Sequence, residues 1–254
     1  MRISVVTVCF NARATIGQTI ASVASQDWSD FEHLVIDGAS TDGTAQLVRQ
    51  MAHPRLRLIS EPDQGLYDAM NKGLREATGT YVGFLNADDF FATPAALRSI
   101  GEAAERTGAE CILGDTAFVD QQGRRKGRLY SASRFKEWWL RIGAMPPHPS
   151  FYARTGTLRD AGGFDTRYKI AADFDLIARL ILGRKASWTR TGRVISCFRL
   201  GGVSTANFQA KLTIGREMAD SLRRLGQPIA GLAVQLRYPL KLLQYGAGLF
   251  RTDG

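Results

Sequence analysis

Short hydrophobic runs of strand length alternate with amphipathic stretches of helix length through the first half of the chain. The run Thr80–Leu85, for example, is rich in β-branched and aromatic residues and follows the turn-forming segment Ala77–Gly79. The pattern predicts strands at Ile3–Cys9, His33–Ile36, Leu56–Ile59, Thr80–Leu85 and Cys111–Gly114, and helices at Thr15–Gln26, Gly43–Met51, Leu66–Ala77 and Pro94–Thr107. This βα series predicts an α/β fold with a mostly parallel central sheet and helices on both faces. Ligands bind such sheets at the carboxyl ends of the strands.

The second half of the chain has a different pattern. It predicts a hairpin from Thr116–Asp120 and Arg125–Tyr130, a short aromatic helix around Phe135–Leu140 and a helix over Ala171–Leu182. No repeat or low-complexity linker interrupts the chain. We therefore predict one domain over residues 1–205 and a C-terminal helical extension over residues 206–254.

The extension places leucines at helical spacing between basic residues, at Leu232, Leu236, Leu240 and Leu243. One interpretation is an amphipathic helix that lies on an anionic membrane surface. The other is a hydrophobic stripe that packs on the domain or on a second subunit, which would make the chain a homo-oligomer. Both interpretations stay open at the level of sequence.

Composition limits the classes of partner. The chain has 254 residues, 44% of them hydrophobic, and a net charge of +9. Its basic residues are scattered without interleaved aromatics, so we expect no nucleic-acid partner and favour a membrane surface or a phosphate-bearing substrate. Cys9, Cys111 and Cys197 show neither disulfide nor metal-ligand spacing, which indicates a reducing compartment. Without a long apolar run, we expect no membrane-spanning helix.

Polar residues follow four of the predicted strands: Asn11, Asp37, Asp63, and the pair Asp88 and Asp89. Turn and helix-capping explanations stay open for the segments around Asp37 and Asp63. The Asp88–Asp89 pair is harder to explain by capping, because Thr93 and Pro94 suit the N-cap and N1 positions of the next helix. Since parallel strands end at one edge of a sheet, their joint occurrence indicates a site that binds cations.

Two phosphate-binding fingerprints are missing from the sequence. No G-x-G-x-x-G follows the first strand, and no G-x-x-x-x-G-K-[ST] occurs. A pyrophosphate would therefore need another partner, such as a divalent metal held by one carboxylate and by the phosphates themselves. Asp88 is the candidate ligand.

Several segments together resemble the family 2 glycosyltransferases of the GT-A fold, which is Rossmann-like. They are the run Ile3–Asn11, then IDGASTDGT, SEPDQGLYDAMNKGLREATGTYVGFLNADD, HPSFYAR, GGFD and ADFDLIAR. More narrowly, they resemble bacterial enzymes that build capsular, exopolysaccharide or lipopolysaccharide repeat units. The resemblance implies transfer of a sugar, with inversion, from a nucleotide-diphosphate donor to a saccharide or lipid-linked acceptor. It also implies a cytoplasmic enzyme, peripheral at most on the inner membrane.

The resemblance also implies donor-binding residues: Thr7, Asn11, Asp37, Asp63, Gly65, Asn71, Asn86 and Asp88. Asp37 would contact the nucleotide base, which is uracil in relatives that use UDP-sugars. Asn86-Ala87-Asp88 occupies the Asp-X-Asp metal motif, so Mg²⁺ or Mn²⁺ would rest chiefly on Asp88, with Asp89 supporting it.

The implied general base is Asp173, because Ala172 and Asp173 stand where the family has a Glu-Asp pair. A helix N-terminal carboxylate is the structural alternative. His148 is placed on the acceptor side, and Trp138 and Trp139 would either stack there on a sugar ring or a lipid phosphate region, or form a small aromatic core. Asn86 and Ala172 depart from the family pattern, which leaves open a catalytically degenerate sugar-nucleotide-binding protein.

A nucleotidyltransferase is disfavoured, because the glycine-rich basic loop expected near the N-terminus is absent.

Overall fold

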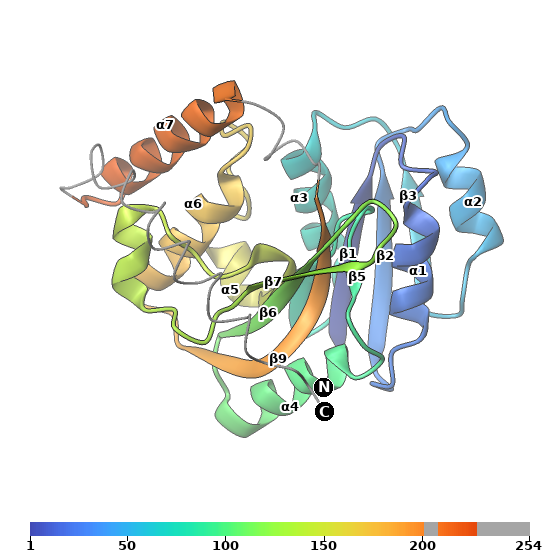
Figure 1. Cartoon of the computed structure of the whole chain (residues 1–254), viewed down its shortest axis with the longest axis horizontal. Helices are drawn as coiled ribbons and strands as arrows, with labels where there is room; N and C mark the ends of the chain where they lie inside the picture. Colours follow the sequence, from blue (N-terminus) through green and yellow to red (C-terminus); the bar gives the residue numbers. More distant parts are fainter. Residues whose placement is uncertain (201–207, 228–254) are drawn as a thin grey trace.

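The computed structural model describes residues 1–200 and 208–227, and it is an α/β fold with helices on both faces of one sheet (Figure 1). The strands are β1 (Ile3–Cys9), β2 (Phe31–Asp37), β3 (Leu56–Ser60), β4 (Tyr81–Phe84), β5 (Phe90–Phe91), β6 (Cys111–Val119), β7 (Arg125–Tyr130), β8 (Phe151–Arg154) and β9 (Trp188–Arg199). The α-helices are α1 (Ile16–Ala24), α2 (Thr44–Gln50), α3 (Leu66–Glu76), α4 (Ala96–Thr107), α5 (Thr155–Asp160), α6 (Ala172–Ala178) and α7 (Phe208–Arg224). Short 3₁₀ helices η1 (Glu137–Ile142) and η2 (His148–Ser150) and a π-helical turn η3 (Arg179–Gly183) complete the described chain.

The first half of the sheet is parallel, in the order β3-β2-β1-β4. Side chains of β1 alternate between the two faces, as a period of two requires. Val6 and Val8 pack in the core on the α3 face, whereas Ile3 and Val5 pack in the core beneath α4. Both faces of β1 are therefore covered, which confirms the predicted α/β class and explains its continuous apolar run.

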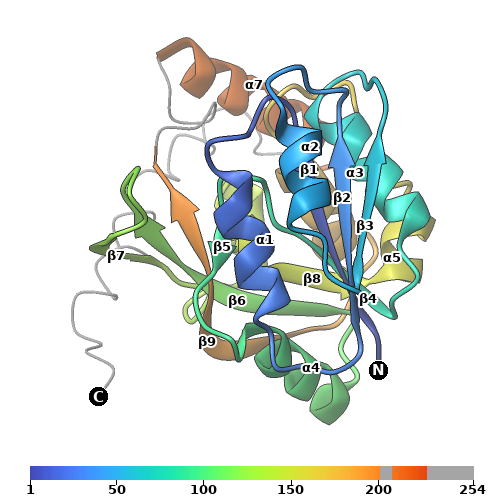
Figure 2. The same ribbon diagram turned by 90° about the vertical axis from the view of Figure 1, so that its right-hand side faces the viewer.

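The second half of the sheet is mixed. β8 runs antiparallel to both β4 and β6, β9 runs parallel to β6, and β5 and β7 are antiparallel to β9 and β6. Figure 2 shows β6, β7 and β9 curling away from the parallel strands, with α4 below them. The predicted hairpin is confirmed as β6 and β7, but the two short strands expected at 111–114 and 116–120 form the single strand β6.

The structure corrects the expected start of α4. The helix begins at Ala96, and Thr93 is not its N-cap. Instead Gln26, just beyond α1, supplies the cap: its Oε1 accepts the N–H of Leu97 at 2.9 Å and its Nε2 donates to the Thr93 carbonyl at 2.9 Å. A side chain distant in sequence thus satisfies the orphan helix donor.

Helix α7 lies against α6, and its Met218 and Leu222 join the main core cluster (Figure 1). The boundary at residues 205 and 206 stays a prediction. The leucine pattern from Leu232 to Leu243 lies outside the described residues. Within the described ranges, no helix has the length and apolar character needed to cross a membrane.

Candidate active site

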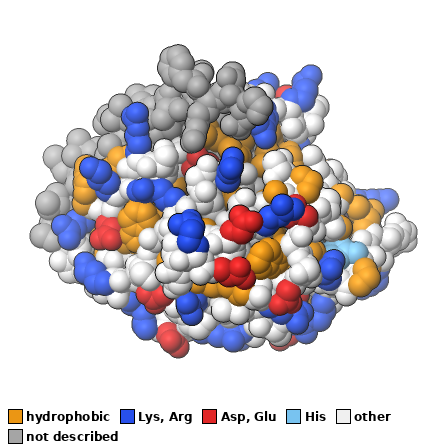
Figure 3. All heavy atoms as spheres, turned by 90° about the horizontal axis from the view of Figure 1, so that it is seen from below, with side chains coloured by type: hydrophobic (Ala, Val, Ile, Leu, Met, Phe, Trp, Pro, Cys, Tyr) orange, Lys and Arg blue, Asp and Glu red, His pale blue; other side chains and the backbone are white. Residues whose placement is uncertain are grey.

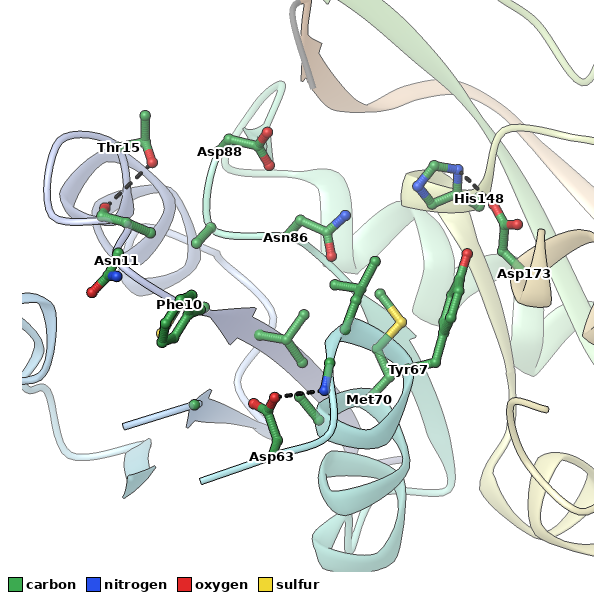
Figure 4. A pocket seen from close by; sticks show the side chains of 18 of the residues that line it. Phe10, Asn11, Thr15, Asp63, Tyr67, Met70, Asn86, Asp88, His148 and Asp173 are labelled. Atoms are coloured by element: carbon green, nitrogen blue, oxygen red, sulfur yellow. Dashed lines mark hydrogen bonds and ion pairs between the residues drawn. The ribbon is translucent and has the colours of Figure 1, made fainter. Parts of the chain in front are cut away.

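A cavity of about 680 Å³ opens at the carboxyl ends of β1 and β4. It lies between the strand-end loops on one side and the N-termini of α3 and α6 on the other (Figure 4). Among the predicted site residues, those that line it are Asn11, Asp63, Gly65, Asn86, Asp88, His148 and Asp173. The strand-end rule therefore located the cavity correctly.

Asn86 and Asp88 form one wall. Asn86 Oδ1 is buried and has no hydrogen-bond partner in the described part of the chain. The Asp88 carboxylate projects beside it into the same space (Figure 4). A buried acceptor without a partner is costly, so Asn86 is suited to a ligand that supplies the missing interaction.

Asp89 and Arg199 lie behind this wall. Asp89 is fully buried and its Oδ1 accepts the N–H of Arg199 at 3.1 Å, while Arg199 Nε donates to the Asp88 carbonyl at 3.1 Å. Burial, and next the charge of Asp88, raises the pKa of Asp89 well above its ordinary value. Arg199 of β9 therefore fixes the backbone that carries Asp88.

Asp173 and His148 form the opposite wall. Asp173 Oδ2 lies 3.3 Å from His148 Nδ1, and Asp173 Oδ1 accepts the N–H of Phe174 at 2.8 Å. Both side chains are partly exposed, at 17% for Asp173 and 26% for His148. A carboxylate oriented by an imidazole and open to the cavity is suited to accept a proton from a bound hydroxyl group.

Asn11 and Gly65 have backbone conformations that restrict their residue types. Asn11 has φ 49°, which asparagine tolerates better than most residues, and its Oδ1 accepts the N–H of Thr41 at 2.9 Å. Gly65 has φ 111°, and its N–H donates to Asp63 Oδ1 at 2.8 Å. These bonds hold the two loops that edge the cavity.

Three residues expected to bind donor do not line the cavity. Thr7 is fully buried and its Oγ1 is hydrogen-bonded to His33 Nε2 at 3.0 Å. Asn71 exchanges two 2.8 Å hydrogen bonds with the backbone of Phe164. Asp37 is fully buried and accepts hydrogen bonds from Ser40 and from Ser60, the latter at 2.6 Å. All three side chains hold the framework around the cavity.

The two tryptophans also lie elsewhere. Trp139 is buried in the main core cluster, which matches the aromatic-core alternative. Trp138 is 49% exposed and lines a separate hollow with basic side chains such as Lys136 and Arg141. Neither ring lines the cavity that holds His148.

Other lining residues have no expected role from sequence. Tyr67 and Met70 face the cavity from α3 at a spacing of three residues, and Phe10 stands at the mouth with 64% exposure. The Tyr67 hydroxyl donates to the Ile170 carbonyl at 2.6 Å. Burial, and next the charge of Asp173, raises the pKa of Tyr67 well above its ordinary value, so the phenol stays neutral. The only sequence signal for these residues was the aromatic Phe10 between the end of the first predicted strand at Cys9 and the polar Asn11.

Comparison with known proteins places the chain in a family. The model of Glycosyl transferase family 2 matches residues 4–164. The chain belongs to this family. This family 2 glycosyltransferase is 30% identical over 180 residues to the PGL/p-HBAD biosynthesis glycosyltransferase of Mycobacterium tuberculosis, covering 69% of this chain and 68% of the relative. It is 26% identical to the chondroitin synthase of Escherichia coli, covering 70% of this chain and 26% of that protein.

Solved structures confirm the GT-A fold. S. aureus TarS 1-349 in complex with UDP-GlcNAc matches with a TM-score of 0.67 and 20% identity, over 87% of this chain and 66% of that chain. The mannosyltransferase PcManGT from Pyrobaculum calidifontis, in complex with GDP-Man and Mn²⁺, matches with a TM-score of 0.66 and 20% identity, over 97% and 73%. The chain spans 65% of the TarS chain solved with UDP, just under two thirds.

Proposed function

We propose that this glycosyltransferase moves a sugar with inversion from a nucleotide-diphosphate donor, preferentially a UDP-sugar, to a saccharide or lipid-linked acceptor in cell-surface polysaccharide assembly. The observation that carries the proposal is the pair of opposed walls in one cavity. Asn86 and Asp88 lie on one side, and the Asp173–His148 pair lies on the other. A donor diphosphate at the first wall would leave its sugar directed at the second.

In the proposed reaction, Asp173 is the general base. Its carboxylate accepts the proton of the acceptor hydroxyl as that oxygen bonds to the anomeric carbon. The bond from the anomeric carbon to the diphosphate breaks on the opposite face, so the configuration inverts. His148, at 3.3 Å, orients the carboxylate toward the acceptor.

The residues fit a divalent ion shared with the donor. One carboxylate, from Asp88, and the partnerless amide oxygen of Asn86 face the cavity. In the described part of the chain, no group of three or more His, Cys, Asp or Glu side chains could hold a metal ion. Hard ions such as Mg²⁺ or Mn²⁺ are commonly held by only one or two protein carboxylates, with substrate oxygens completing the coordination shell. When bound, such an ion would neutralise charge on the leaving diphosphate.

The relatives support the donor class. TarS was solved with UDP-GlcNAc, and PcManGT with GDP-Man and Mn²⁺. Relatives named for chondroitin synthesis and for PGL/p-HBAD biosynthesis support an acceptor in glycoconjugate assembly. Asp63 and Gly65 would contact the nucleoside from the loop before α3, and Phe10 and Asn11 would contact it from the loop after β1.

A thermal-shift panel tests this proposal. The melting temperature of the protein is measured with UDP-, GDP- and dTDP-sugars, each with and without Mn²⁺ or Mg²⁺. Nucleotide release is then measured for each combination of sugar nucleotide and metal that raises the melting temperature. We expect a UDP-sugar with metal to stabilise most and to be turned over. Binding without turnover on any acceptor would instead favour a degenerate sugar-nucleotide-binding protein. Stabilisation by the donor that is the same with and without the metal ion would overturn the role of Asp88.

A further inference from the structure

Three consecutive backbone N–H groups just before α6 point at one carboxylate. The N–H of Lys169 donates to Glu217 Oε1 at 2.8 Å, and those of Ile170 and Ala171 donate to Oε2 at 3.0 and 2.9 Å. Glu217 lies on α7, beyond the end of the family match at residue 164. Consecutive N–H groups form a concave anion site, and here a side chain from a distant helix fills it.

The same backbone turn carries the cavity wall. Ala171 is the N-cap residue of α6 and stands two residues before Asp173. Ile170 lines the cavity, and its carbonyl accepts the hydroxyl of Tyr67 from α3 at 2.6 Å. The turn is therefore held from two sides, by α3 through a carbonyl oxygen and by α7 through the N–H groups.

Further contacts fix α7 against this region. Ser221 donates to Asp175 Oδ1 at 2.7 Å, and the Tyr168 hydroxyl donates to Asp220 Oδ2 at 2.9 Å. Asp175 also accepts a hydrogen bond from Arg179 at 2.7 Å. Helix α7 is thus hydrogen-bonded to residues on both sides of Asp173, while the carboxylate of Asp173 lines the cavity. Figure 1 shows α7 lying alongside α6.

We propose that Glu217 is a positioning residue for Asp173, and that α7 belongs to the catalytic unit of this enzyme. By fixing the 169–171 backbone, Glu217 sets the first turn of α6 and with it the distance and angle of Asp173 to His148 and to the acceptor. The inference rests on the proposed role of Asp173 as base. A small displacement of a catalytic group can lower the rate of the chemical step strongly, and we expect the affinity for the donor to change little.

The test compares Glu217→Gln with Glu105→Gln, which makes the same exchange at an exposed position of α4. We expect Glu217→Gln to lower kcat by about tenfold or more, while the donor Kd stays within about twofold of the unmodified protein. The control should change neither value. A folded Glu217→Gln protein with unchanged kcat overturns the inference. Substitution of a residue that only stabilises the fold would lower the melting temperature but leave kcat unchanged at temperatures where the protein is folded.

A second variant covers the case in which Glu217→Gln fails to fold. Glu217→Asp keeps the charge but withdraws it from the N–H groups, so a folded Glu217→Asp protein should show reduced kcat with donor affinity retained. Unchanged kcat there also overturns the inference. Asp173→Asn, measured in parallel, separates the two proposals: full activity in Asp173→Asn refutes the base itself, whereas an inactive Asp173→Asn beside a fully active Glu217→Gln refutes only the role of Glu217.

Discussion

At the scale of single residues, neighbouring carboxylates have unequal roles. Asp88 faces the cavity, whereas Asp89 is fully buried and accepts a backbone hydrogen bond from Arg199. The same division separates Asp173, which lines the cavity, from Asp175, which is buried and paired with Arg179. In each pair, one carboxylate lines the cavity and the other is buried: Asp89 accepts a backbone N–H, and Asp175 accepts hydrogen bonds from the side chains of Arg179 and Ser221.

Asp88→Asn tests the first of these pairs. We expect it to remove metal-dependent stabilisation by the donor and to lower turnover by on the order of 100-fold, because a single amide cannot replace the charge that a divalent ion needs. Donor titration in a thermal-shift assay, with and without Mn²⁺, measures the effect. Asp30→Asn, an exposed exchange of equal charge, is the control. Metal-dependent stabilisation that survives in Asp88→Asn would show that another group holds the ion.

The sequence predicted the cavity-lining residues better than it predicted the supporting ones. Asp88 was recognisable from the pattern, because the carboxylate pair at the end of its strand had no capping role, whereas Asn86 and Asp173 were identified only through the resemblance to the family. Thr7 and Asn71 were not separable from them, because a polar side chain satisfied within the core has the same identity as one that binds a ligand. Their partners, His33 and the Phe164 backbone, are brought to them only by the folded chain.

At the scale of elements, the hydrophobic pattern of the sequence predicted the strands and helices of the first half of the chain. The βα units before residue 108 have amphipathic helices and strands that are buried except for the partly exposed β3, and their predicted ranges agree with β1 to β4 and α1 to α4 within a few residues. The chain gave no such signal for β5, a two-residue strand that exists only by pairing with β9. β9 is half-exposed over its first seven residues, so its hydrophobic alternation is weak. Its position depends on β6, distant in sequence.

The buried His33 on β2 gives a pH prediction at this scale. Burial, and next the charge of His53, lowers the pKa of His33 to about 3, so the ring stays neutral in the fold. In the unfolded chain the ring protonates near pH 6.5, so acidification below that value favours unfolding by about 1.4 kcal/mol per pH unit. We expect about 2 kcal/mol of unfolding free energy to be lost from this residue between pH 6.5 and pH 5.

His33→Gln tests that prediction, because glutamine keeps a polar group near Thr7 and does not titrate. Urea denaturation at several pH values should show a flatter dependence below pH 6.5 in the variant than in the unmodified protein. If the two proteins lose stability in parallel, His33 is protonated in the fold and its assignment as a neutral core residue is wrong.

At the scale of the whole molecule, the positive charge is spread out on the face that Figure 3 shows and along the sequence. Figure 3 shows basic and acidic side chains interspersed over one face, without one continuous apolar patch in the coloured part. A net charge of +9 would still draw the protein toward an anionic surface at low salt. We therefore propose that any membrane association depends on the sequence after residue 226, where leucines and basic residues alternate.

Truncation after Gly226 tests the membrane proposal. The full chain should sediment with vesicles that contain anionic phospholipid, less so with zwitterionic vesicles and less at high salt. The truncated chain keeps α7 and should stay in the supernatant. Equal sedimentation of both chains would show that the tail is not needed for binding and would place the binding surface within residues 1–226.

The central claim is that Asp173 is the base that activates the acceptor, and Asp173→Asn tests it most directly. Donor Kd and sugar transfer are measured on the same folded preparation, beside the exposed Asp160→Asn as control. We predict that transfer falls by about 10²- to 10⁴-fold while the donor Kd stays within about twofold. Transfer at the unmodified rate in Asp173→Asn would contradict the account.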